Sequence, residues 1–281
     1  MAAPSTPPSS APKISESSIF NSPTGDVTFI SSDLVLFKLH STHLNVNSMG
    51  FANFSENTIV GKELVPLAEH STILDVLFQF IEPPPESREF RQPLVGSLKP
   101  ELLFKLAEAA EKYIVYAAMN VCITRMQQLV KEYPLEALNH SAMHGYRDLA
   151  DEAAKNSLLR PLDQVAIKLT GPGVIQRYLI YLSKYQEPAK KAISRFEGIL
   201  LDPMQCPVWI YAYAKYRQQV DRSLLSIDIR PEIPEEDSDL TTCTNEMCQC
   251  KDLYLELRWP RFLEKYSNLP PVVPTFSTIT I

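Results

Sequence analysis

Glycine is scarce in this chain, with 8 residues among 281. All-β folds with many tight turns use glycine where the backbone needs a positive φ, so this scarcity argues against such a fold. No apolar run approaches the roughly 18 residues that a transmembrane helix needs, and we expect no membrane span. An excess of basic residues is also missing: the formal net charge is -6. A general affinity for nucleic acid is therefore not expected.

The number of cysteines is odd, and the first twenty residues have neither a basic start nor the apolar stretch of a signal peptide. Both observations predict free thiols in a reducing compartment, the cytoplasm or the nucleus. The five cysteines are Cys122, Cys206, Cys243, Cys248 and Cys250.

Hydrophobic residues make up 45% of the chain, so a sizeable core can be buried. Proline is abundant, with 23 residues, and it clusters in the tails and between helical patterns, where it ends elements. Residues 1–23 are rich in Ser, Pro and Ala. Such a segment buries too little apolar surface to offset its ordering entropy, so we expect a disordered tail.

Residues 26–44 predict two short strands joined by a tight turn and followed directly by a helix. Apolar and polar side chains alternate on both sides of the Ser32-Asp33 turn, which is typical of a hairpin. One face is mostly apolar, so the hairpin must be covered. We expect short helices near residues 41–54 and a third strand at about 63–67, placed near a sheet edge by Pro66. The segment 72–81, TILDVLFQFI, is apolar on most sides and predicts a buried helix.

Helical spacing of apolar residues continues after a Pro-rich loop at residues 82–97. From Pro134 the pattern is helical throughout, and Pro134 and Gly145 bracket one short helix. We expect the fold class α+β: a small sheet flanked by helices, followed by an all-helical C-terminal region. The predicted divisions are a domain at 24–132, a helical extension at 133–227, an acidic linker at 228–242, and a Cys-containing segment with a terminal helix at 243–281.

Several marks, in order, resemble the BTB/POZ family: DVTF at 26–29, FKLHSTHL at 37–44, a Ser before an aromatic residue, LFQFIEP at 77–83 and LAEAAEKY at 106–113. The resemblance covers about residues 24–132. The fold landmarks of that pattern fall on Asp26, His40, Ser48 and Tyr113. RDLADEAAKNSL at 147–158 resembles the helical extension of basidiomycete fungal BTB proteins. The sequence departs from the pattern at Glu82 to Pro85, where Tyr-Thr-Gly is usual.

This resemblance implies a small sheet flanked by helices, no catalysis, no cofactor, and binding of other proteins. Such domains often form homodimers, and some bridge substrates to a cullin-type ubiquitin-ligase scaffold. Phe54 and Glu56 fit the hydrophobic-x-Glu contact motif of those adaptors. The expected function is thus a protein-interaction adaptor with no direct nucleic-acid or membrane binding. Transcriptional regulation through partners is an alternative.

Three groups of residues are candidates for a chemical site. His40 and His43 lie near Ser41, but no GxSxG turn surrounds a serine, so a structural role is favoured over a nucleophilic one. His140 and His144 share a helix face, a spacing that metal sites use, but the Glu of an HExxH motif is missing. A structural role is therefore favoured over metal binding. Free thiols are favoured over zinc ligation at Cys206, Cys243, Cys248 and Cys250, because the usual C-x2-C pair is missing. An enzyme that uses these His and Cys groups is the less favoured alternative. In the tyrosine-rich stretch, Tyr181 and Tyr211 lie off the apolar stripes and are predicted to be at the surface.

Overall fold

The computed structural model describes residues 13–51, 64–82, 92–158, 160–200 and 274–280. The chain divides into two compact units, Met1–Leu129 (unit 1) and Val130–Ile281 (unit 2). The described residues form a mixed α+β fold with one four-stranded sheet and eight α-helices, which confirms the predicted class. None of these helices combines the length and the apolarity that a membrane span requires.

The hairpin predicted from the alternating pattern is present in unit 1. Strands β2 (Val27–Ile30) and β3 (Val35–Leu39) pair antiparallel, with Val27 opposite Leu39. Strand β4 (Leu64–Pro66) joins β2 in parallel, and the strand order is β1-β3-β2-β4. β4 is therefore an edge strand, as Pro66 predicted, because proline cannot donate a ladder hydrogen bond.

The prediction of a disordered tail over residues 1–23 is wrong for its second half. Strand β1 (Ser15–Asn21) pairs in parallel with β3 and forms the other edge of the sheet. Phe20 anchors it in the core at 2% exposure. Ser17 Oγ accepts a hydrogen bond from the amide N–H of Phe20 and donates one to Asp75 Oδ1 at 3.2 Å. The buried Phe20 ring and the hydrogen bonds of Ser17 hold this segment in the sheet, although its composition predicts a disordered tail.

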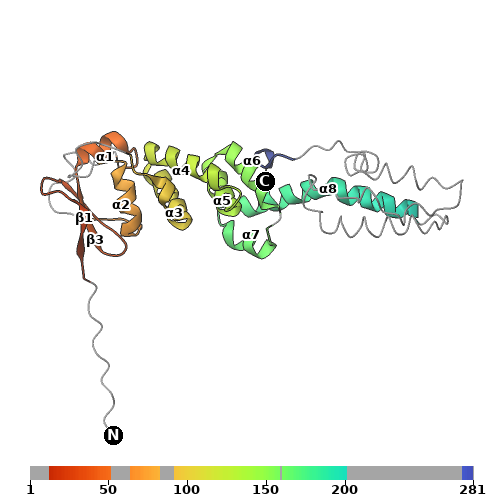
Figure 1. Ribbon diagram of the computed structural model, residues 1–281, viewed down its shortest axis with the longest axis horizontal. Helices are drawn as coiled ribbons and strands as arrows, with labels where there is room; N and C mark the ends of the chain where they lie inside the picture. Colours follow the sequence, from red (N-terminus) through yellow and green to blue (C-terminus); the bar gives the residue numbers. More distant parts are fainter. Residues whose placement is uncertain (1–12, 52–63, 83–91, 159, 201–273, 281) are drawn as a thin grey trace, which may run out of the picture. The chain divides into compact units, whose positions relative to one another are not determined.

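Helix α2 (Ser71–Gln79) lies between the sheet and helix α3 (Pro100–Tyr113), as Figure 1 shows. Its Phe78 ring contacts rings from three other segments, with centroids 5.3 Å from Phe37, 5.6 Å from Phe29 and 5.9 Å from Phe20. All four rings are buried. This cluster, together with the buried leucines of α2 and α3, is the core of unit 1 and confirms the buried character predicted for α2.

Two helices of unit 1 begin in the same way, with a His-Ser-Thr triplet whose serine is held by an aspartate of the hairpin. The Ser41 amide at the start of helix α1 (Ser41–Asn47) donates to Asp26 Oδ1 at 2.7 Å. The Ser71 amide at the start of α2 donates to Asp33 Oδ1 at 2.8 Å. Both serine hydroxyls donate to the second carboxylate oxygen. Each aspartate thus satisfies an orphan helical N–H with a charge that suits the helix dipole.

The end of unit 1 and the start of unit 2 are helical. After a 3-10 turn η1 (Val95–Ser97) and α3, helix α4 (Tyr116–Leu129) completes unit 1. Helix α5 in unit 2 spans Pro134–His144, with Gly145 at φ 81°, so the predicted start and stop are confirmed. The remaining unit 2 elements are α6 (Arg147–Ser157), α7 (Leu162–Lys168), α8 (Val174–Leu200) and the 3-10 turn η3 (Phe276–Thr278).

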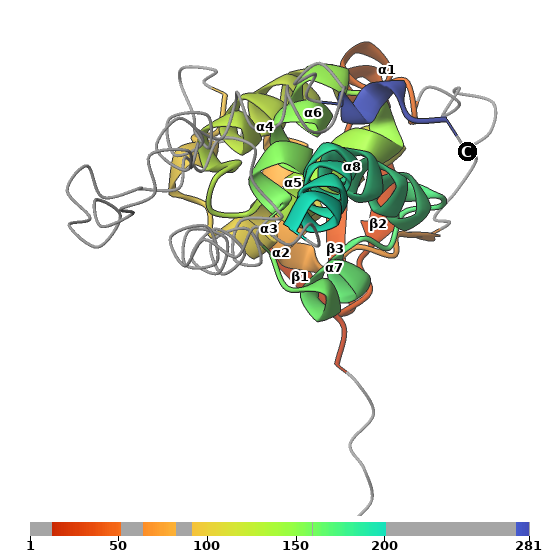
Figure 2. The same ribbon diagram turned by 90° about the vertical axis from the view of Figure 1, so that its right-hand side faces the viewer.

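Turn η3 packs beside α6, although 119 positions or more separate them in sequence (Figures 1 and 2). The Ser277 amide donates to Asp151 Oδ1 at 2.6 Å, and its hydroxyl donates to Oδ2 at 2.8 Å. The serines at the starts of α1 and α2 bind an aspartate in the same way, through both the amide and the hydroxyl. The buried Phe276 ring meets the Tyr181 ring edge-on at 5.9 Å.

The prediction that Tyr181 lies at the surface is wrong. Tyr181 is 1% exposed, whereas Leu179 on the same helix is 47% exposed. The buried face of α8 follows Tyr178, Tyr181 and Tyr185, because the ring of Phe276 covers a part of the helix that local periodicity cannot foresee. Tyr211, the acidic linker and most of the Cys-containing segment fall within 201–273, outside the described residues.

Candidate functional site

A polar cluster in unit 1 connects the end of the hairpin to the end of α2. His40 is the residue immediately before α1, and its amide donates to Glu82 Oε2 at 2.9 Å. Its ring Nδ1 lies 2.6 Å from Glu82 Oε1, and its Nε2 lies 3.0 Å from Thr24 Oγ1. Glu82 is buried, at 5% exposure. The carboxylate of this residue therefore holds both the backbone and the ring of His40.

His43, one turn further along α1, points its Nδ1 at the same carboxylate. The distance to Glu82 Oε2 is 3.7 Å, and the His40 and His43 ring centroids are 5.4 Å apart. His43 Nδ1 is buried and has no hydrogen-bond partner. The ligand atoms of His40, His43 and Glu82 all lie within 4.8 Å of one another, a grouping that could hold a metal ion.

Thr24, His40 and Glu82 are joined in the order hydroxyl, imidazole, carboxylate, which is also the order of a nucleophilic triad. A triad additionally needs a substrate cavity and an oxyanion site beside the hydroxyl. Neither of the two hollows described in unit 1 is lined by these three residues. The chain of hydrogen bonds fixes the His40 ring, and the structural role predicted for His40 remains the simpler interpretation.

Two further fold landmarks, Ser48 and Tyr113, are in contact at the end of α3. Ser48 Oγ donates to the carbonyl oxygen of Tyr113, and the Gly50 amide donates to the same oxygen at 2.9 Å. A Cβ at Gly50 would lie 2.6 Å from the Tyr113 backbone, so only glycine fits. The Tyr113 ring stacks on Phe51 at 4.4 Å. These contacts fasten the segment after α1 onto α3, which is a structural task.

The Tyr113 hydroxyl donates to the carboxylate of Glu69, which also accepts from Lys112 Nζ at 2.7 Å. Partial burial opposes ionisation of Glu69, but the bonds from Lys112 and Tyr113 hold its pKa below the usual range. Burial, followed by the Glu69 interaction, raises the pKa of Tyr113 to about 12. This phenol therefore stays neutral and acts as a hydrogen-bond donor.

The second histidine pair lies in unit 2. His140 is buried, its ring centroid is 4.6 Å from that of His144, and it stacks on Tyr146. His144 is in the last turn of α5, where a partial positive charge suits the carbonyl end of a helix.

The other predicted sites are not within the described residues. The proposed contact residues Phe54 and Glu56 belong to 52–63, and Cys206, Cys243, Cys248 and Cys250 belong to 201–273. The fifth cysteine, Cys122, is buried in α4, and burial raises the pKa of its thiol to about 12. It is a core thiol and not a nucleophile.

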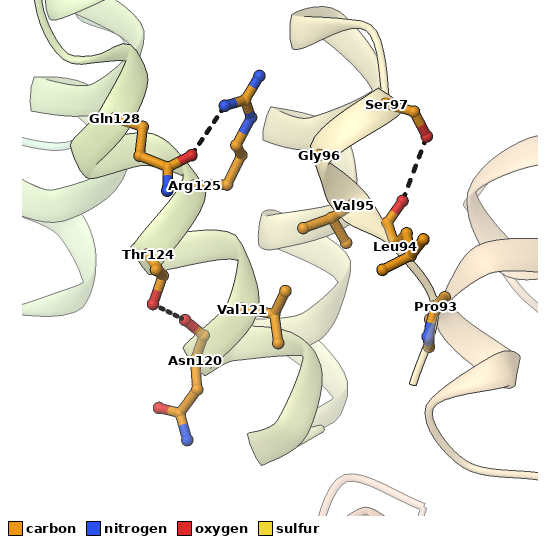
Figure 3. A pocket seen from close by; sticks show the side chains of 10 residues that line it. All are labelled: Pro93, Leu94, Val95, Gly96, Ser97, Asn120, Val121, Thr124, Arg125 and Gln128. Atoms are coloured by element: carbon orange, nitrogen blue, oxygen red, sulfur yellow. Dashed lines mark hydrogen bonds between the residues drawn. The ribbon is translucent and has the colours of Figure 1, made fainter. Parts of the chain in front are cut away.

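Two surface features of unit 1 could receive another molecule. One is an open hollow of about 540 Å³ between η1 and α4. Figure 3 shows Leu94 and Val95 on one side and Val121 and Arg125 on the other. The second is an apolar patch made of Met49 and Tyr116, which are 61% and 54% exposed; Val46, three positions before Met49, is 82% exposed. The Tyr116 hydroxyl donates to Met49 Sδ at 2.9 Å, which holds those two side chains together.

Comparison with protein-family models and with curated proteins gave no match for this chain. The candidate sites therefore depend on their geometry alone.

Sequence reasoning missed Glu82 as a partner of His40, because 42 positions separate them. It read Glu82 only as the first residue of a Pro-rich loop. The apolar patch was missed as well: Met49, like Val46, falls within a segment predicted to be short helices, and only the structure shows that both face outward.

Proposed function

We propose that this chain is a protein-interaction adaptor of the BTB/POZ type, acting in the cytoplasm or nucleus. The order of elements that follows strand β1 in unit 1 supports this: a hairpin, a short helix, an edge strand, a buried helix and a helical pair. This order is the one that the sequence resemblance implies. The proposal includes self-association, and a cullin-type scaffold is one candidate partner.

The observation that carries the proposal is the apolar patch. Scattered exposed apolar residues are ordinary, but neighbouring ones that include methionine and tyrosine are typical of protein interfaces. Met49 and Tyr116 come from different elements and are in contact. Covering them with a partner removes apolar surface from water, which drives association. The predicted contact residues Phe54 and Glu56 follow Met49 closely in sequence.

The enzyme alternative receives less support. It requires His40, His140, His144 and the cysteines to meet in one cleft. Within each described unit, the histidines make structural contacts with neighbouring rings and carboxylates.

Self-association can be tested by light scattering on the full chain over a range of micromolar concentrations. The wild-type chain is expected to exceed the monomer mass of 31.8 kDa. A Met49→Asp, Tyr116→Asp double variant is expected to remain at that mass, because each aspartate would have to be buried at the interface. Leu162→Asp is the matched control: Leu162 is 61% exposed, but it is on α7.

A monomeric wild-type chain throughout this range would show that self-association is wrong. Equal association of wild type, double variant and control would show that the apolar patch is not the interface. Circular dichroism should be the same for all three proteins, because each altered side chain is exposed.

A further inference from the structure

The cluster of His40, His43 and Glu82 has a property that its structural role leaves unexplained. His43 Nδ1 is buried without a hydrogen-bond partner, yet it faces a carboxylate oxygen at 3.7 Å. An orphaned buried polar atom normally lowers stability by about 1–3 kcal/mol. His43 Nδ1 lies beside the Glu82 carboxylate and the His40 imidazole, and these three groups together have the arrangement of metal ligands.

We propose that His40 Nδ1, His43 Nδ1 and the Glu82 carboxylate form a zinc-binding site. Two imidazoles and one carboxylate are a ligand set that zinc accepts, with bonds of about 2.0–2.2 Å. Tetrahedral ligands at that bond length lie roughly 3.4 Å apart. The His43–Glu82 distance of 3.7 Å is close to this value, and the 2.6 Å His40–Glu82 contact must lengthen toward it when the ion binds. This proposal does not depend on the proposed adaptor function.

Thr24 supplies the support that ligand histidines usually have. A metal-bound imidazole donates its other ring N–H to a fixed acceptor, which sets the tautomer. Thr24 Oγ1 is 3.0 Å from His40 Nε2 and can accept a hydrogen bond from that N–H. A His40 ring that binds zinc through Nδ1 carries its single proton on Nε2, and this Nε2–H donates to Thr24 Oγ1.

The site has room for a fourth ligand. The His40 and His43 side chains are 29% and 43% exposed, whereas that of Glu82 is 7% exposed. A zinc ion between them would therefore be shielded by the protein next to the Glu82 carboxylate and accessible to water next to the two imidazoles, so that water can be the fourth ligand. Zinc there would connect the start of α1 to the end of α2. The Asn47 side chain already donates to the Ile81 carbonyl across the same junction at 2.8 Å.

Competition with a chromophoric chelator on the full chain would count the bound zinc ions. His43→Ala is expected to bind one equivalent fewer than wild type, and its metal-free thermal stability is expected not to fall, because His43 Nδ1 makes no hydrogen bond that the substitution could remove. Thr24→Val should keep the site but weaken it about 10- to 100-fold. The matched control is His70→Ala: His70 Nε2 lies 3.3 Å from Asp33 in a similar His-carboxylate pair.

Cobalt distinguishes this site from the cysteines. Thiolate ligands give cobalt an intense charge-transfer absorption in the near ultraviolet, whereas imidazole and carboxylate ligands give mainly weaker visible bands. His43→Ala is expected to remove visible intensity and to leave any thiolate band unchanged. The same zinc count and affinity in wild type and His43→Ala would overturn the proposal. So would a loss confined to the thiolate band.

Discussion

Replacing Phe20 by alanine tests whether the N-terminal strand belongs to the folded unit. Phe20 is 2% exposed, and its ring centroid lies 6.5 Å from that of Phe37 and 5.9 Å from that of Phe78. The ring joins an edge strand to the centre of the core. If residues 1–23 were a disordered tail, the substitution would change nothing.

The expected loss in the free energy of unfolding is about 3–5 kcal/mol, the range for a buried Phe→Ala change that leaves a cavity. Part of the ring faces Phe78 edge-on, and such a contact adds about 0.5–1.5 kcal/mol to burial alone. The total stability of a domain is about 5–15 kcal/mol, so the variant should be visibly less stable. Ile14→Ala is the control: Ile14 lies just before β1 and is 52% exposed. Its expected change is within about 0.5 kcal/mol.

Urea unfolding should be followed by far-ultraviolet circular dichroism. Tryptophan fluorescence would miss unit 1, because both tryptophans, Trp209 and Trp259, belong to unit 2. Hydrogen exchange of peptides from β3 and α2 would assign the loss to unit 1. A change below about 1 kcal/mol for Phe20→Ala, equal to that of Ile14→Ala, would refute the assignment of β1 to the core.

Three further predictions concern other parts of the chain. Partial burial raises the pKa of Asp33, but the larger sum of hydrogen bonds from Ser71 and nearby groups lowers it from 3.8 to about 2. The stability this adds, about 1 kcal/mol after allowing for solvent screening, is present above pH 4 and lost as the pH falls toward 2. The stability difference between wild type and Asp33→Asn in urea titrations should shrink over that interval, and a constant difference would contradict this. Burial raises the pKa of the Cys122 thiol to about 12, so mass spectrometry after alkylation should find Cys122 unmodified in native protein and modified in urea. Phe276→Ala should speed amide exchange in residues 275–279 by at least about a hundredfold, because its ring anchors η3 on Tyr181; unchanged exchange would show that the aspartate bonds suffice.

Local patterns predicted the elements that local physics determines. The alternation around Ser32-Asp33 predicted the hairpin, and Pro134 and Gly145 predicted both ends of α5. β1 could not be predicted in the same way. Three of its seven residues are serine, and its order depends on one phenylalanine that inserts between rings 17 and 58 positions away. The orientation of α8 was misjudged for a similar reason, since Phe276 covers Tyr181 from far along the chain.

The polar cluster shows where sequence reasoning stops. His40 was identified as a landmark, and His43 was noted beside it. Glu82 connects them only after α2 has been placed against the sheet, and no spacing in the sequence indicates that meeting. The repeated His-Ser-Thr at 40–42 and 70–72 is visible in the sequence, but its meaning depends on two hairpin aspartates that lie 15 and 38 positions from the serines they hold.

The most direct test of the adaptor proposal is quantitative mass spectrometry of proteins that co-purify with the tagged full chain in cells that also express a second, differently tagged copy. The proposal predicts that wild type and Leu162→Asp recover the second copy and at least one other protein near stoichiometry. It also predicts that Met49→Asp, Tyr116→Asp loses them. Recovery of only background proteins by wild type, or the same recovered set with all three chains, would contradict it.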